Sequence, residues 1–113
     1  MKKATVNKLE DAGWAVGNAS DFLGLSPEEE ALVEIRLALG DEVRESRKRA
    51  KLTQVALAKR LGSSQSRVAK IETGDTTVSI DLQMKALLAA GSKPGAAFSA
   101  LARRLSRRTQ KAA

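Results

Sequence analysis

The sequence predicts an all-α fold, a compact bundle of about five helices, and three observations lead to this class. Apolar residues recur at helical spacing in one segment after another, and Ser, Thr and Gly stand where such segments begin and end. The apolar content is mainly Ala, Leu and Val, with only one Trp and two Phe, which favours a small aliphatic core over a β sandwich. A length of 113 residues suits one domain with additional end segments.

The first segment, residues 1–25, has weak periodicity and three glycines, so we expect an irregular N-terminal arm. Its large apolar side chains, Trp14 and Phe22 among them, are poor candidates for full exposure. They can either pack on the helical domain or dock on a partner or a second subunit.

A helical domain is expected over residues 26–91, and it opens with a long helix at about 27–50. Ser26 can cap this helix, and Glu29 completes a capping box. The apolar stripe continues in phase past Gly40, so we predict one helix that can bend there, with a break into two helices as the alternative. Basic residues follow near its end, either as a solvated face or as phosphate contacts.

Two short helical patterns surround a tight turn within residues 52–74. Thr53 can cap the first helix, and Gly62 can end it, because glycine tolerates positive φ. Either of the two serines that follow can cap the second helix, which we expect at about 65–72. Two short helices joined by a glycine-containing turn predict a helix-turn-helix.

The second helix of this pair has a polar outward face. Its members are Gln65, Ser66, Arg67 and Lys70. Gln can pair bidentately with adenine and Arg with guanine, while Ser bonds several bases and Lys reaches phosphate or guanine. They cluster at the end of the helix that enters the major groove in this motif. We therefore predict base reading, with an ordinary helical hairpin and a solvated face as the alternative.

The remaining chain predicts a turn and two more helices. Residues 74–77 form the turn, which is either a plain loop or a phosphate contact, and Ser79 caps a helix at about 80–90. We interpret 92–113 as a linker, a short helix at about 96–108 and a basic tail.

The apolar stripe of this last helix consists of Phe98, Leu101 and Leu105. It is too thin to be stable alone, so the helix must dock on the domain, a second subunit or a partner. The basic tail either keeps the protein soluble or attracts phosphate.

The net charge of +7 is spread unevenly along the chain. Residues 1–40 have a balance of −3, residues 41–92 of +4 and residues 93–113 of +6. The middle and the end of the chain are therefore the candidates for a nucleic-acid surface.

Several functional classes are not expected from this composition. Cys and His are both absent, which excludes disulfides, Cys/His metal sites and Ser-His or Cys-His catalysis. With no phosphate-binding loop either, we expect no enzyme, no cofactor and no metal. No run of about 18 apolar residues predicts a transmembrane helix. No apolar stretch follows the first lysines to indicate a secretory signal, and the lack of Cys fits a reducing cytoplasm.

A family resemblance follows from the stretch TQVALAKRLGSSQSRVAKIETGD. It resembles the helix-turn-helix of the Cro and phage-repressor (Xre-type) family over about residues 41–91. The matching elements are Thr53-Gln54, Ala58, Leu61-Gly62, Ser64-Gln65, Val68 and Ile71-Glu72-x-Gly74. The resemblance implies a lambda-repressor-like bundle and a sequence-specific transcriptional regulator of double-stranded DNA. With this motif we expect a repressor that reads a palindromic operator as a homodimer.

The resemblance also implies roles for individual residues. Gln54 would open the first motif helix and bond a phosphate, and the outward set of the second helix would fall on base-reading positions. Arg47 and Glu72 would form a partly buried ion pair that ties the first helix to the third. Further phosphate contacts are expected from Ser64, Thr76, Thr77 and Lys59. Ser66 departs from the pattern, because several family members carry a longer side chain there.

A second resemblance involves the residues before the motif, FLGLSPEEEALVEIRLAL. A helix-turn-helix preceded by such a segment is similar to HigA-type antitoxins, which neutralise a RelE- or HigB-like ribonuclease and repress their own operon. This similarity implies a toxin-binding surface formed by Trp14, Phe22, Leu25, Leu32 and Ile35. A coactivator-like bridging protein, with the motif used for protein contact, is a further alternative that absent DNA binding would indicate.

Overall fold

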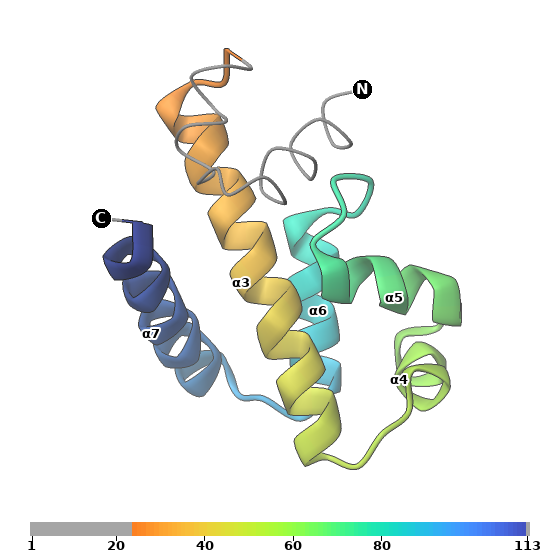
Figure 1. The fold of residues 1–113 in the computed structure, drawn as a ribbon. Helices are drawn as coiled ribbons and strands as arrows, with labels where there is room; N and C mark the ends of the chain where they lie inside the picture. The colour runs from red at the N-terminus through yellow and green to blue at the C-terminus, as the bar shows by residue number, and fades with distance from the viewer. Residues whose placement is uncertain (1–23, 113) are drawn as a thin grey trace.

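The computed structural model describes residues 24–112, which form five α-helices (Figure 1). These are α3 (Pro27–Arg49), α4 (Gln54–Leu61), α5 (Gln65–Thr73), α6 (Ile80–Ala89) and α7 (Pro94–Ala112). The predicted all-α class with about five helices is confirmed. Most of the expected N-terminal arm, including Trp14 and Phe22, lies outside the described residues. Within the described part of the chain, every helix is too short or too polar to span a bilayer.

The long helix α3 is the element against which α5, α6 and α7 pack. It lies in the middle of the bundle, with α4 and α5 on one side and α7 on the other (Figure 1). Ser26 caps it as predicted, because its hydroxyl accepts from Glu29 N at 3.1 Å and Glu29 accepts from Ser26 N at 2.8 Å. The helix is unbroken, so the alternative of two helices is wrong.

Gly40 leaves room for α5 to pack closely on α3. It lies where α5 crosses α3, and a Cβ there would be 2.5 Å from the backbone oxygen of Glu72. On the other helix, Gly74 follows α5 with φ of 71°, and a Cβ there would be 2.9 Å from Arg36 O. Two glycines therefore let the backbones of α3 and α5 approach more closely than any side chain allows.

The predicted helix ends are present in the motif. Thr53 accepts a hydrogen bond from Ala56 N at 3.0 Å, and Gly62 ends α4 in the left-handed conformation with φ of 65°. Of the two candidate serines, Ser64 is the one that caps α5. Ser79 likewise caps α6 by accepting from Leu82 N at 3.0 Å.

The core forms where these helices meet α3. Its buried apolar members are Ala38, Leu39, Val43, Leu57, Ala58, Val68, Ile71, Val78, Ala86, Leu87, Ala90, Ala97 and Leu101. One polar side chain is fully buried beside them: Gln83 donates from Nε2 to the carbonyl oxygens of Arg36 and Ile71, both at 3.0 Å. Gln83 thus joins α6 to the backbones of α3 and α5, and it stabilises their close approach.

The last helix, α7, is longer than the sequence predicts. It begins at Pro94 and runs for 19 residues, so only Ser92 and Lys93 remain as a linker and much of the expected tail is helical. It docks on the domain itself, mainly against α3, and its Ala97 and Leu101 are buried in the core. The expectation that Phe98 belongs to the docking stripe is wrong, because its side chain is 62% exposed.

Candidate nucleic-acid interface

The four predicted base-reading residues lie together on the first two turns of α5. Gln65, Ser66, Arg67 and Lys70 are all exposed, while Val68 between them is buried in the core. Packing of the inward face therefore fixes which side chains α5 presents to solvent. Ser64 precedes them as the N-cap, and its hydroxyl accepts from Arg67 N at 3.2 Å and bonds the hydroxyl of Ser66 at 3.2 Å.

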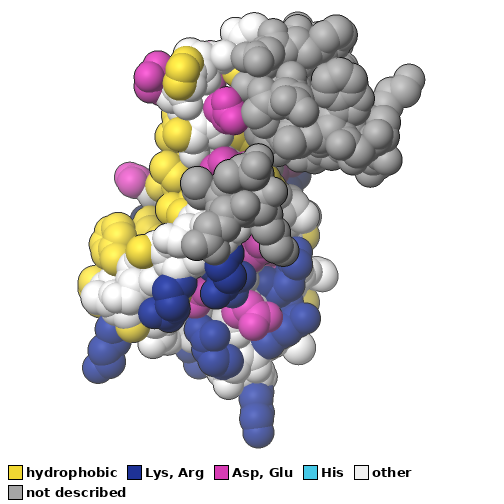
Figure 2. Space-filling view, turned by 60° about the vertical axis from the view of Figure 1, so that its left-hand side comes forward, with side chains coloured by type: hydrophobic (Ala, Val, Ile, Leu, Met, Phe, Trp, Pro, Cys, Tyr) yellow, Lys and Arg dark blue, Asp and Glu magenta, His cyan; other side chains and the backbone are white. Residues whose placement is uncertain are grey.

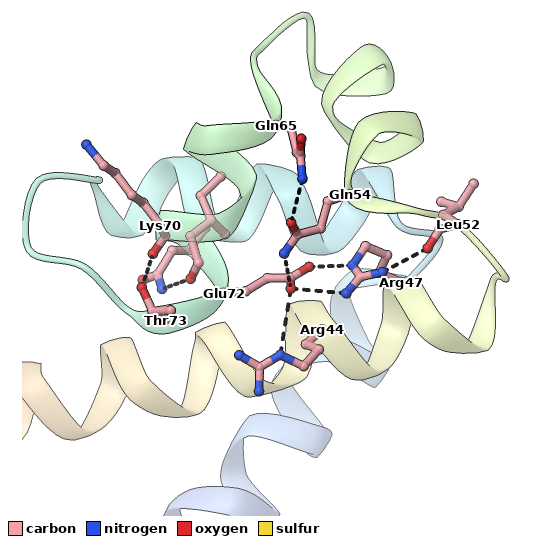
Figure 3. Close-up of polar contacts among 10 residues, drawn as sticks. Arg44, Arg47, Leu52, Gln54, Gln65, Lys70, Glu72 and Thr73 are labelled. Atoms are coloured by element: carbon pink, nitrogen blue, oxygen red, sulfur yellow. Dashed lines mark hydrogen bonds and ion pairs between the residues drawn. The ribbon is translucent and has the colours of Figure 1, made fainter.

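Behind this exposed face, a chain of hydrogen bonds leads into the domain (Figure 3). Gln65 Nε2 donates to Gln54 Oε1 at 3.3 Å, and Gln54 Nε2 donates to Glu72 Oε1 at 3.0 Å. The carboxylate can only accept, so it fixes which end of the Gln54 amide faces Gln65. Gln65 is left with its oxygen and one N–H, the acceptor and donor that the major-groove edge of adenine requires.

Glu72 anchors this chain from inside the protein. Its carboxylate accepts from Arg47 Nε at 2.5 Å and from Arg47 Nη2 at 3.2 Å, and Arg44 lies 3.7 Å away. Arg47 also donates to Leu52 O at 2.9 Å, in the segment that leads into α4. The Glu72 side chain is 1% exposed, so desolvation makes each of these partners necessary. The structure thus brings Arg47 and Glu72 together as an ion pair between α3 and α5.

Residues 38–91 match a family model described as a helix-turn-helix domain, and the match includes α4, α5 and α6. The match covers 54 of the 113 residues, so this part of the chain is similar to helix-turn-helix domains. Neither curated proteins nor solved structures gave a significant match to the chain. Helix-turn-helix domains of DNA-binding proteins place the second helix of the motif in the major groove. In this chain that helix is α5.

The turn after α5 is less available to phosphate than its sequence suggests. The backbone N–H and the hydroxyl of Thr77 both donate to Asp75 Oδ1, at 2.8 and 2.7 Å. Both donors are therefore engaged with a carboxylate, which itself repels phosphate. Thr76 is exposed beside them. Arg36 of α3 donates to Val78 O and holds the turn against the domain.

A polar hollow of about 170 Å³ lies between the start of α5 and this turn. It is lined by Ser64, Ser66, Arg67, Lys70, Thr77 and Val78. Its two cationic side chains and the hydroxyls of Ser64 and Ser66 suit an anionic group, and the positive end of the α5 dipole adds to the attraction.

The basic residues of α4 divide into two kinds. Lys59 is exposed, as its predicted phosphate contact requires. Arg60 instead donates to Ala89 O at 3.0 Å, at the end of α6. Sequence reasoning did not find this contact, nor the burial of Gln83, because each depends on a segment far along the chain.

Proposed function

We propose that this protein is a sequence-specific transcriptional regulator that reads double-stranded DNA with α5. The observation that carries this proposal is the hydrogen-bonded chain from Gln65 through Gln54 to Glu72. An exposed polar side chain on an ordinary surface has no such support from a buried ion pair. A side chain held in one orientation loses less entropy on binding, which favours discrimination between bases.

The roles we assign follow from side-chain chemistry. Gln65 reads adenine, Arg67 reads guanine, and Lys70 bonds guanine or phosphate, with Ser66 in reach of one further base. Phosphate contacts from Gln54, Ser64, Lys59 and Thr76 set the register on the duplex. We assign Thr77 the weakest phosphate contact, because Asp75 occupies both of its donors. The regulator is non-catalytic and needs no cofactor or metal.

We further propose that the protein acts as a homodimer on a palindromic operator. A single α5 spans few base pairs, and helix-turn-helix dimers gain specificity from two half-sites one helical turn apart. Repression by obstruction of the promoter is the simplest outcome of such binding.

The decisive experiment selects bound duplexes from a random pool and then titrates the best sequence and a scrambled duplex by fluorescence anisotropy. We expect a palindromic consensus bound on the order of a thousandfold more tightly than the scrambled control. Weak binding that is equal for both duplexes and lost at modest salt would reject the proposal, because charge alone explains it.

Arg67→Ala then tests the base-reading role within the same experiment. We expect a cost of roughly 1–3 kcal/mol on the consensus and a relaxed preference at one base pair. Lys85→Ala removes the same charge from an exposed position on α6 and serves as the matched control. A loss for Arg67→Ala that is uniform across all sequences would make Arg67 a phosphate contact instead.

A second candidate function is that of a HigA-type antitoxin for a RelE- or HigB-like toxin. The favouring observation is the first part of α3, which extends beyond the other helices (Figure 1) and carries Glu28, Glu29, Glu30 and Glu34 without a basic residue between them. Leu32 is 45% exposed among them. Leu25 and Ile35 are half-buried, and Ile35 packs against the core, so Leu32 offers the most accessible contact of the three. An acidic surface with an apolar centre suits a small basic protein.

Co-expression with the small basic protein of a neighbouring reading frame tests this candidate. If the candidate is right, the wild type restores growth and Leu32→Glu does not. Leu88→Glu is the matched control, because Leu88 is similarly exposed, at 42%, on α6. Equal rescue by both variants, or no rescue by the wild type, would reject the toxin-binding role of α3.

A further inference from the structure

The helix α7 brings a second basic surface to the molecule, on the opposite side of α3 from α5 (Figure 1). We therefore expect that a straight duplex on α5 does not reach it. Figure 2 shows this side of the molecule, where Lys and Arg side chains gather around a few Asp and Glu. The matched helix-turn-helix domain ends at residue 91, before α7 begins.

The seam between α7 and α3 is hollowed along its length. Three neighbouring hollows of about 450, 280 and 270 Å³ follow one another. The first two share Arg49, Ser92 and Ala96, and the last two share Arg104 and Arg107, so the three hollows adjoin one another in a row along the seam. We call it the arginine groove and define it by its basic lining, namely Arg49, Lys93, Arg103, Arg104, Arg107 and Arg108.

The arginine groove keeps an excess of positive charge. Its acidic lining consists of Asp41 and Glu42 alone, against the six basic residues. Burial acts to raise the pKa of Glu42, but hydrogen bonds from Arg104 and Arg49, at 2.8 and 3.0 Å, outweigh it and hold the pKa below its ordinary value. Glu42 is therefore ionised at neutral pH and orients two guanidinium groups from the bottom of the groove.

Three cations remain for a ligand. Arg103, Arg107 and Lys93 are exposed, and none of them forms an ion pair within residues 24–112. Arg103 and Arg107 lie one turn apart on the same face of α7, about 6 Å along its axis. The side chains that line the groove between the cations are small, namely Ser92, Ala96 and Ala100. An extended polymer chain can therefore come close to the helix backbone.

We propose that the arginine groove binds the phosphate backbone of a second DNA segment, independently of the segment on α5. Guanidinium groups repeated along a helix match the repeated phosphates of a strand, since each can donate two hydrogen bonds to one phosphate. The lining of the groove holds no aromatic side chain on which a base could stack, so we expect contacts to the phosphates without sequence preference. An acidic protein segment is the rival ligand, but DNA is already concentrated beside a protein held on an operator.

The consequence is that one molecule joins two duplexes. Sequence-independent contacts on one side let the protein hold to any DNA, while α5 searches another segment. The choice of DNA as the ligand rests on the proposed function of α5, but the two surfaces use different residues and can be tested separately.

The test compares two double variants of the full chain with the same loss of charge. Arg103→Ala with Arg107→Ala removes two free cations of the groove, and Lys48→Ala with Lys85→Ala removes two exposed cations elsewhere. A random 20-base-pair duplex is titrated at several salt concentrations by anisotropy. We expect the slope of log affinity against log salt to fall by about 2 for the groove variant, which corresponds to the two lost phosphate contacts. Equal slopes for the two double variants would overturn the proposal, since net charge would then explain the binding.

A capture assay provides the second arm. Wild-type protein on an immobilised duplex should retain a labelled second duplex, and the groove variant should retain at most a tenth as much. Arg103→Lys with Arg107→Lys keeps the charge and should restore part of the capture. Stronger competition by poly-glutamate than by DNA of equal charge would overturn the phosphate assignment in favour of an acidic protein. If selection finds no consensus for α5 but capture persists, only the proposed regulator function fails.

Discussion

The helices α5 and α7 are both held on α3 by a buried carboxylate that meets an arginine, yet the two junctions differ in how closely they fit. Glu72 and Arg47 join α5 to α3 with side chains 1% and 13% exposed, next to backbones that touch at Gly40. Glu42 and Arg104 join α7 to α3 with 5% and 21% exposed, beside open hollows. Base reading needs a helix fixed to within about 0.5 Å. Phosphate attraction needs only a helix that stays attached, so the looser junction is sufficient for α7.

The largest expected effect lies at the closer junction. Glu72→Ala leaves Arg47 buried without its partner and also removes the support of Gln54, so we expect a loss of about 3–5 kcal/mol in the free energy of unfolding. Urea denaturation measures it. Glu45→Ala, at an exposed position on α3, should change stability by no more than about 0.5 kcal/mol. A cost below about 1 kcal/mol for Glu72→Ala would remove the distinction between the two junctions.

The backbone contact between α3 and α5 is tested by Gly40→Ala. The new Cβ would meet Glu72 O at 2.5 Å, so α5 must move away, and we expect a loss of about 1–3 kcal/mol. Because α5 moves, the affinity for the operator should fall further than stability alone explains. Gly95→Ala in α7 is the control, since a Cβ there meets nothing within 4 Å. This substitution should increase the free energy of unfolding, by at most about 1 kcal/mol.

The ion pairs at the junction of α7 with α3 should make the stability of the protein depend on pH. The pKa of Glu42 is lowered in the folded protein because its hydrogen bonds to Arg104 and Arg49 outweigh the effect of burial. A carboxyl of this kind stabilises the protein above its ordinary pKa of 4.5 and loses that contribution as the pH falls through the lower folded value. Glu42→Gln should therefore lose less stability than the wild type between neutral pH and acid, by on the order of 1 kcal/mol. Parallel curves from urea melts at each pH would contradict this.

The smallest effect is expected at the outer edge of the same junction. Arg108 lies 3.4 Å from both Glu34 and Asp41, and all three side chains are partly exposed. Arg108→Ala should cost less than about 1 kcal/mol at low salt, and the difference should vanish near 1 M salt. A larger cost that persists in salt would mean that this edge is as closely fitted as the contact around Glu72.

Local chemistry made most of the fold predictable. Ser26, Thr53 and Ser79 each cap the helix expected of them, because a cap depends only on residues three positions away. The outward face of α5 was likewise predictable from the spacing of Val68 and Ile71. The base-reading and phosphate roles stay predictions, since they require bound DNA.

Contacts between distant segments could not be predicted from the patterns in the sequence. Glycine has a low helix propensity, but at position 40 any larger residue would collide with the backbone of α5. Gln83 is polar and buried, because two carbonyl oxygens from other helices bond its amide. Arg104 looks like part of a basic tail until α7 folds back onto Glu42. In each case the deciding partner lies at least 30 positions away or on another helix, beyond the reach of a periodic pattern.

The uninterrupted course of α3 has a consequence for how the protein opens. Three other helices pack on α3, and α4 packs mainly on two of them, so the part of α3 that they cover cannot unwind without releasing them. Its central amides should therefore exchange hydrogen with solvent only when the whole bundle unfolds. Unwinding of this part of α3 would therefore remove both proposed DNA surfaces in a single cooperative step.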